Sequence, residues 1–206
     1  VMAELDLAML TPLRHPHLAN DLSIKPESVL LAGVPGTGKS FLAEYLIHSD
    51  INALFLPLNS QKLAASLLNN DRSPADLFML QVDTVQARCG LPVVILIDDI
   101  EQMLTKPEAV IQLLNILQGV KERGFILLAS TNYPKTIDDR LFEWGRFSVA
   151  IHVPLPGPRE VSGVLRCHTA YRNFINSEER MWVVEHYTNK CRGWSQRDLL
   201  SLCDIA

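Results

Sequence analysis

The sequence lacks the features that mark two large classes of protein. No apolar run approaches the roughly 18 residues that suggest a membrane-spanning helix, and the first residues do not form a signal peptide. Acidic residues outnumber basic ones by 23 to 19, and the net charge of −4 argues against a broad surface for nucleic acid. We therefore expect no membrane segment in this stretch of chain and no direct nucleic-acid partner.

Cysteine is also scarce, and its spacing excludes a common kind of metal site. The sequence has no C-x-x-C pair, so we expect reduced, buried thiols in the cytoplasm or another reducing compartment. The four cysteines are Cys89, Cys167, Cys191 and Cys203. Since the sequence opens with Val1 and stops within a predicted helix at Ala206, we also expect it to be part of a longer protein, whose targeting signals would be missed.

What the sequence does contain is the phosphate-loop pattern G-x-x-x-x-G-K-[ST], between a predicted strand at residues 28–32 and a predicted helix at residues 41–47. Its glycines allow backbone N–H groups to point at phosphate oxygens. Lys39 would reach the β- and γ-phosphates, and the Ser40 hydroxyl would ligate Mg²⁺. The alternative is a glycine-rich turn beside a surface lysine. The predicted nucleotide-binding residues are Gly33, Val34, Pro35, Gly36, Thr37, Gly38, Lys39, Ser40 and Phe41.

Strands and helices alternate through the first three quarters of the chain. Pro57 suggests that the second strand lies near a sheet edge, and the apolar run at residues 93–97 is typical of a strand buried on both faces. We predict an α/β fold, the five-stranded parallel sheet of P-loop NTPases flanked by helices. The other predicted strands are at residues 53–58, 125–129 and 148–153, and the predicted helices between them are at residues 61–68, 75–88 and 108–120, the last with Ile111, Leu114 and Leu117 on its apolar face.

The strands stop at the proline-rich stretch of residues 154–158. Beyond it we predict three helices, at residues 159–170, 177–187 and 195–205, with Ser177 and Ser195 as N-caps of the last two. This predicts two domains, a nucleotide-binding α/β core at residues 1–155 and a small C-terminal helical lid at residues 156–206.

Polar residues follow two of the predicted strands at their carboxyl ends. Asp98, directly after residues 93–97, is positioned to hold Mg²⁺, and Asp99 would orient the attacking water. Two carboxylates that cap a following helix are the alternative. Asn132 follows the next strand and would face the γ-phosphate and the same water, although an asparagine after a strand is more often a turn residue.

Several motifs, in their expected order, resemble those of the AAA+ ATPases, specifically the AAA clade proper. Residues 13–26 are similar to the clade's "hPelf…gikpp" approach to the Walker A strand, residues 93–99 to its Walker B strand and residues 129–132 to its sensor 1 strand. Residues 137–156 resemble the second region of homology, with its "GRF" and "vpLP" endings. Residues 193–199 are similar to the "GfsGADL" start of the lid helix that carries sensor 2.

The resemblance implies an ATP- and Mg²⁺-dependent motor that assembles as a ring, usually a hexamer. ATP would lie at subunit interfaces, and hydrolysis would drive loops that pull on a protein in the central pore. An arginine from one subunit would stabilise the γ-phosphate bound by its neighbour, an effect of about 10³ to 10⁵ in rate in other NTPases. Arg146 is our first choice for this role and Arg140 the second, because the first arginine of the clade's "R-P-G-R-F" aligns with Glu143.

Three further positions depart from the clade's pattern. The second Walker B acid, usually Glu, is Asp99, whose shorter side chain moves the carboxylate by about 1 Å; a displacement of that size can lower the rate on the order of 100-fold. Arg197 replaces the usual Ala; it would contact the γ-phosphate, as in other AAA+ branches, or be a surface arginine paired with Asp198 or Glu185. Where the clade has an aromatic pore loop, this chain has Leu67 and Leu68, which are equally explained as core positions.

Three functions are therefore weighed. The first is a ring-forming ATPase that remodels proteins, and the second is a subunit that binds ATP for assembly or regulation with weak hydrolysis. The third, a small-molecule kinase, is disfavoured because we find no phosphoacceptor site. In the second function, the departures at Asp99 and Glu143 would be the reason why hydrolysis is weak. The rate of hydrolysis is therefore what separates the first two functions.

Overall fold

The computed structural model describes residues 1–48, 51–58, 74–104, 107–137, 141–142, 147–170 and 176–205. Within these ranges five parallel strands form one sheet, in the order β2-β3-β4-β1-β5. The predicted five-stranded parallel sheet is thereby confirmed, although the fourth strand runs two residues farther than expected, through Thr131. The strands are β1 (Val29–Ala32), β2 (Leu54–Leu58), β3 (Val93–Ile97), β4 (Ile126–Thr131) and β5 (Val149–His152).

Strand β2 is at the edge of the sheet, as Pro57 suggested. Among the described strands it pairs with β3 alone, and Pro57 is opposite Leu96 in the parallel register. Proline has no N–H to donate to a ladder, so an edge strand accepts it at less cost than a central one. The central strands β3, β4 and β1 are buried throughout, which explains their nearly continuous apolar sequences.

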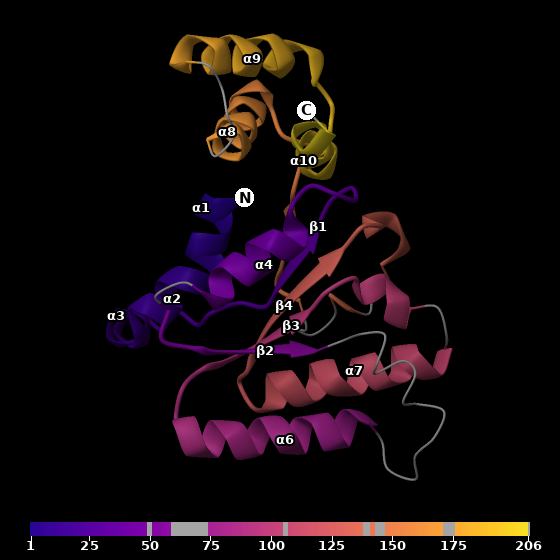
Figure 1. Cartoon of the computed structure of the whole chain (residues 1–206). Coiled ribbons are helices and arrows are strands. Elements are labelled where there is room, and N and C mark those ends of the chain that lie inside the picture. Colours follow the sequence, from indigo (N-terminus) through magenta and orange to yellow (C-terminus); the bar gives the residue numbers. More distant parts are fainter. Residues whose placement is uncertain are drawn as a thin grey trace. The chain divides into compact units, whose positions relative to one another are not determined.

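Helices cover the sheet on both faces. Figure 1 shows α6 (Pro74–Cys89) and α7 (Pro107–Glu122) side by side on one face and α4 (Lys39–Ile47) on the other. Side chains of β3 alternate between the faces, so Ile95 joins the core under α6 and α7, while Leu96 lines a cavity beside α4. That core buries residues from both helices, including Met79, Val82, Leu113, Ile116, Leu117 and Val120.

The N-terminal segment is a series of short helical pieces, and it stays helical across Pro12. Leu5, Met9 and Leu10 are fully buried, which anchors the segment to the rest of the chain. The pieces are α1 (Met2–Leu5), the π-helical η1 (Asp6–Leu10), α2 (Thr11–Arg14) and α3 (Pro16–Asp21).

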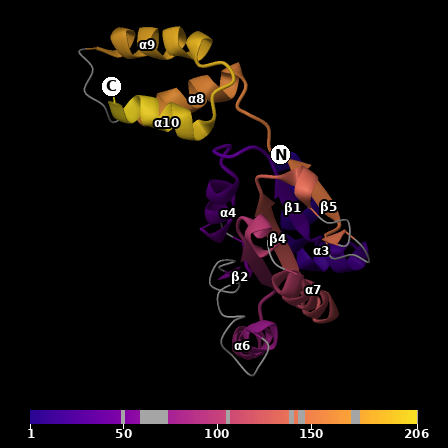
Figure 2. The same ribbon diagram turned by 90° about the vertical axis from the view of Figure 1, so that its right-hand side faces the viewer.

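The chain divides into two compact units. The first comprises residues 1–32 and 40–152, and the second comprises residues 33–39 and 153–206, so the phosphate loop groups with the C-terminal helices. In this second unit α8 (Pro158–Thr169) packs against both α9 (Ser177–Lys190) and α10 (Gln196–Ile205), as Figure 2 illustrates. The three helices enclose a separate small core of Val161, Leu165, Val184, Cys191, Leu199 and Cys203.

Two details of this helical unit test the predicted N-caps. Asn176 caps α9, because its side chain accepts a hydrogen bond from the Glu179 N–H at 2.7 Å; the prediction of Ser177 was wrong by one residue. Ser195 caps α10 as predicted, its Oγ accepting from the Asp198 N–H at 3.2 Å. Both residue types satisfy the N–H groups that a first helical turn leaves open.

All four cysteines are free thiols, as predicted, but only two of them are buried. Cys191 and Cys203 lie in the core of the helical unit, and burial raises the pKa of the Cys191 thiol. Cys89 and Cys167 are exposed, which corrects the expectation that every cysteine is a core residue. Separately, none of the helices in the described ranges has both the length and the apolar character needed to cross a membrane.

Candidate functional site

The phosphate loop of the second unit has a backbone that only glycine fits well at three positions. Gly36 and Gly38 have φ angles of 79° and 92°, in the left-handed region that other residues rarely adopt. At Gly33 the constraint is space, because a Cβ atom would lie 2.3 Å from the Val153 carbonyl oxygen. The two glycines of the motif, and Gly36 between them, are therefore explained by the shape of this loop.

The loop also binds its own lysine. Lys39 is only 5% exposed, and its Nζ donates hydrogen bonds to the carbonyl oxygens of Gly33 at 2.9 Å and Val34 at 3.0 Å. The Thr37 hydroxyl, also buried, donates to the same Val34 carbonyl at 3.0 Å. A buried ammonium requires such partners, and these bonds tie the lysine to the start of the loop.

The N-terminal end of α10 packs directly on the loop. The Arg197 N–H donates to the Gly36 carbonyl oxygen at 3.2 Å, while the arginine side chain is exposed. Gln196 lies over Gly38, where a Cβ atom would come within 2.4 Å of its Oε1. Sequence reasoning missed Gln196, and one signal could have found it: it replaces the second glycine of the "GfsGADL" pattern.

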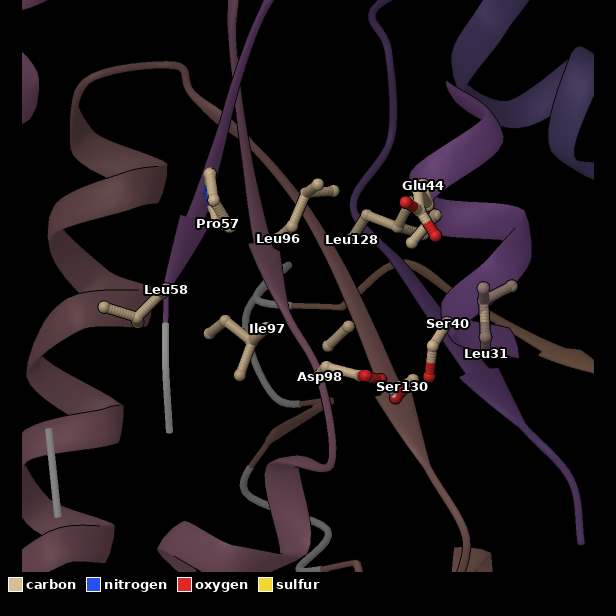
Figure 3. Close-up of a pocket in the computed structure, with 12 residues that line it drawn as sticks. Leu31, Ser40, Glu44, Pro57, Leu58, Leu96, Ile97, Asp98, Leu128 and Ser130 are labelled. Atoms are coloured by element: carbon tan, nitrogen blue, oxygen red, sulfur yellow. Dashed lines mark hydrogen bonds between the residues drawn. The ribbon is translucent and has the colours of Figure 1, made fainter. Parts of the chain in front are cut away.

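In the first unit, three oxygen-bearing side chains gather at one end of a cavity of about 380 Å³. Figure 3 shows Ser40 from the first turn of α4, Asp98 directly after β3 and Ser130 from β4 at this end. The rest of the wall carries the Glu44 carboxylate and apolar side chains such as Leu96 and Leu128. The Ser130 Oγ donates a hydrogen bond to Asp98 Oδ1. Ser130 lies in the stretch that resembles the sensor 1 strand, but it was not singled out from the sequence, because the role given to that stretch falls on Asn132.

The next residue, Asp99, is held in an unusual conformation by the same serine. Its φ and ψ of 49° and 57° are left-handed, and its N–H donates to Ser130 Oγ at 3.0 Å. Aspartate tolerates this region better than most residues, and such conformations cluster at functional sites. The turn starts the 3₁₀ segment η2 (Ile100–Met103) and carries the chain away from β3.

Asn132 joins two carboxylates at the carboxyl ends of β3 and β4. Its Nδ2 donates to Asp99 Oδ1 at 2.7 Å and to Glu101 Oε1 at 3.0 Å. Sequence reasoning predicted that Asp99 and Asn132 serve one site, but it did not identify Glu101. A signal was present in the sequence, since Glu101 follows the two aspartates after a single intervening residue.

The residues of this cavity match the oxygen ligands that Mg²⁺ prefers. Mg²⁺ on a nucleotide is usually held by one or two protein oxygens together with phosphates and waters. The Ser40 hydroxyl and the Asp98 carboxylate supply a pair of that kind. Across the described ranges, no group of three or more His, Cys, Asp or Glu side chains is placed to hold a metal by itself.

Some predicted site residues are exposed to solvent, and others lie outside the described residues. Val34 is 46% exposed and Phe41 is 69% exposed, so neither is needed for packing. The predicted trans arginines Arg140 and Arg146 lie outside the described residues, and so does Glu143. The predicted pore positions Leu67 and Leu68 lie outside them as well, together with the predicted helix at residues 61–68.

A comparison with protein families agrees with the motifs. Residues 29–155 match the family model described as ATPase family associated with various cellular activities (AAA). The match spans more than half of the chain and runs from the first residue of β1 to just beyond β5.

Proposed function

Because the chain belongs to the AAA family of ATPases, we propose that it binds ATP with Mg²⁺ and hydrolyses the γ-phosphate. The residues proposed to contact the nucleotide are Gly33 to Phe41, with their N–H groups and Lys39 on the phosphates. In terms of domains, we propose a nucleotide-binding core at residues 1–155 and a helical lid at residues 156–206.

One observation carries this proposal: the Ser40 hydroxyl and the Asp98 carboxylate line the same end of one cavity. These are the two side chains proposed to hold Mg²⁺, and they come from segments 58 positions apart in the sequence, counting from 40 to 98. When bound, the metal would neutralise charge that develops on the phosphate oxygens.

The remaining strand-end residues suit the activation of water. Asp99 is proposed to accept a proton from, or to orient, the attacking water, and Asn132 to set the direction of the Asp99 carboxylate through the 2.7 Å hydrogen bond. The Ser130 hydroxyl, which bonds both Asp98 and the Asp99 N–H, would keep the two acids in a fixed relation. This division of roles gives the metal and the water separate carboxylates.

Family membership also supports assembly, although only as a proposal for this chain. We propose a ring of AAA subunits in which Arg146, or else Arg140, acts on the nucleotide of a neighbour. Arg197, whose N–H bonds the Gly36 carbonyl, is proposed to respond to the γ-phosphate with its exposed side chain. A protein is the proposed substrate of the ring.

A second candidate function is an AAA subunit that binds ATP but hydrolyses it weakly. Two features of the sequence favour it: the second acid is the shorter Asp99, and Glu143 stands where the clade has its first finger arginine. In this case the nucleotide would stabilise the fold and the assembly by mass action. Turnover in the assembled state, compared with ATP affinity, separates the two functions.

Substitution of the phosphate-loop lysine tests the shared premise of both functions. We expect Lys39→Ala to abolish ATP binding in calorimetry, because the side chain would no longer supply a cation to the phosphates. Lys25→Ala, which removes an exposed lysine before the first strand, is the matched control and should bind ATP as the wild type does. Circular dichroism would establish that both variants fold. Retained micromolar binding by folded Lys39→Ala would contradict the proposal.

A further inference from the structure

Glu101 contacts Asn132 twice through a single oxygen. Its Oε1 accepts a hydrogen bond from the Asn132 backbone N–H at 3.1 Å and another from the side-chain Nδ2 at 3.0 Å. The same Nδ2 donates to Asp99 Oδ1 at 2.7 Å. The Asn132 carboxamide therefore forms a bridge between two carboxylates.

The chemistry of these partners determines which way the carboxamide points. An ionised carboxylate can only accept hydrogen bonds, so the amide nitrogen of Asn132, and not its oxygen, must face both acids. That nitrogen carries two protons, and it has an acceptor for each. Rotation of the Asn132 side chain would therefore break its hydrogen bonds to Asp99 and Glu101 together.

The position of the half-buried Glu101 side chain is not explained by stability. Its second oxygen, Oε2, is inaccessible to solvent and has no hydrogen-bond partner within the described part of the chain. A buried acceptor without a partner opposes folding, and such groups in native proteins often have a functional reason. An apolar side chain at this position would avoid that cost, but it would give Asn132 nothing to bond to.

The local backbone brings Glu101 back toward β4. Asp99, in its left-handed conformation, is anchored through its N–H to Ser130, and the 3₁₀ segment that follows places Glu101 against Asn132. Gln102 Nε2 also approaches the second carboxylate oxygen of Asp99, Oδ2, at 3.5 Å, which is long for a hydrogen bond. Asn132 therefore makes the shorter of these two contacts to the Asp99 carboxylate.

We propose that Glu101 is a positioning residue that holds the Asn132 carboxamide against Asp99 and so fixes the carboxylate that activates water. The inference rests on the proposed function, because it assigns Glu101 a part in the same reaction. Glu101 itself touches neither the nucleotide nor the water in this scheme. Its effect reaches the reaction through Asn132 and then Asp99.

Three substitutions test whether Glu101 affects ATP turnover through Asn132 and Asp99. Glu101→Ala should lower the ATP turnover rate by about 10-fold or more and leave ATP affinity as in the wild type, since the phosphate-binding residues are unchanged. Glu101→Gln should retain most of the rate, because its side-chain carbonyl can accept the same two hydrogen bonds. Adding Glu101→Ala to Asn132→Ala should cause no further loss. Glu108→Ala, which removes an exposed glutamate of α7, is the matched control.

A second measurement does not depend on catalysis. In the ligand-free protein, the side-chain amide resonances of Asn132, assigned with Asn132→Ala, should shift in Glu101→Ala and stay close to their wild-type positions in Glu101→Gln and Glu108→Ala. If the wild type neither binds nor hydrolyses ATP, the proposed function fails. If the wild type hydrolyses ATP while folded Glu101→Ala keeps the wild-type rate, or shows unshifted Asn132 resonances, the role given to Glu101 alone is refuted.

Discussion

The hydrogen bonds of the phosphate loop end on backbone carbonyl oxygens, whereas side chains supply the acceptors at the ends of β3 and β4. In the loop, Lys39 and Thr37 donate to carbonyl oxygens, and the Arg197 N–H donates to another carbonyl. At the strand ends, hydroxyl, carboxylate and carboxamide groups bond one another, as in the contact of Asn132 with Asp99. The loop should therefore be sensitive to added atoms, and the strand ends to the exchange of polar groups.

The largest expected effect is at Asp99, where a single change of functional group should alter the ATP turnover rate and leave ATP affinity unchanged. Asp99→Asn removes the base and should lower the ATP turnover rate by about 100-fold or more, whereas Asp99→Glu extends the carboxylate by one methylene and should raise it by about 10-fold or more. Steady-state turnover, measured beside ATP affinity, checks both. If Asp99→Glu left turnover unchanged, the shorter acid would not be what limits the rate.

A smaller effect is expected from a single methyl group in the loop. Gly36→Ala forces a side chain onto a φ of 79° and places its Cβ 2.7 Å from Ser195 Oγ, so ATP affinity should fall on the order of 10-fold or more. Gly90→Ala is a close control, because Gly90 also has a positive φ, 65°, but an added Cβ there meets nothing within 4 Å. Equal ATP affinity of the two variants in calorimetry would contradict a loop built from close backbone contacts.

The smallest expected effect is on thermal stability, and it concerns the N-cap of α10, where Ser195 and Asp198 are hydrogen-bonded. Hydrogen bonds from the Ser195 hydroxyl and N–H hold the pKa of the Asp198 carboxyl below its usual value of 3.8. A lowered pKa in the folded state adds stability above the unfolded-state pKa, and this stability is lost as the pH falls through the folded-state value. Asp198→Ala should therefore lower the melting temperature slightly at neutral pH.

The lowered pKa of Asp198 also predicts how the effect of Asp198→Ala on stability depends on pH. The difference in melting temperature between the wild type and Asp198→Ala should shrink as the pH falls below about 4, where the wild-type carboxyl also becomes protonated. Thermal unfolding followed by circular dichroism over a pH series measures this difference. Asp76→Ala, which removes an exposed acid from the first turn of α6, controls for the loss of charge at a helix start. A difference that grows on acidification would contradict the assignment.

The sequence was most informative where local chemistry alone determines structure. The glycines and Lys39 of the loop, and the apolar run of β3, were recognisable because a tight turn and a buried strand each demand particular residue types. Glu101 and Gln196 were missed because their partners, Asn132 and Gly38, are distant in the sequence. Which strand end or helix start lies beside a residue is a tertiary property, so the local signals at Glu101 and Gln196 did not say what these residues contact.

The buried face of α7 was also predicted only in part. The expected face included Ile111, which is 56% exposed in the structure. The observed buried face instead includes Leu113 and Ile116, and Leu117 belongs to both the expected and the observed face. Because α7 packs against α6 as well as against the sheet, its apolar stripe is rotated from the one that periodicity alone suggested. The existence of a helix was predictable, but its orientation depended on its neighbour.

The four thiols described above form two classes of chemical reactivity. Cys89 and Cys167 are open to an alkylating reagent in the native state, whereas Cys191 and Cys203 are shielded by the three C-terminal helices. Reagent uptake by the shielded pair would then require those helices to separate. The rate at which Cys191 and Cys203 are alkylated, followed by mass spectrometry, would therefore report how often this helical unit opens, with no engineered cysteine needed.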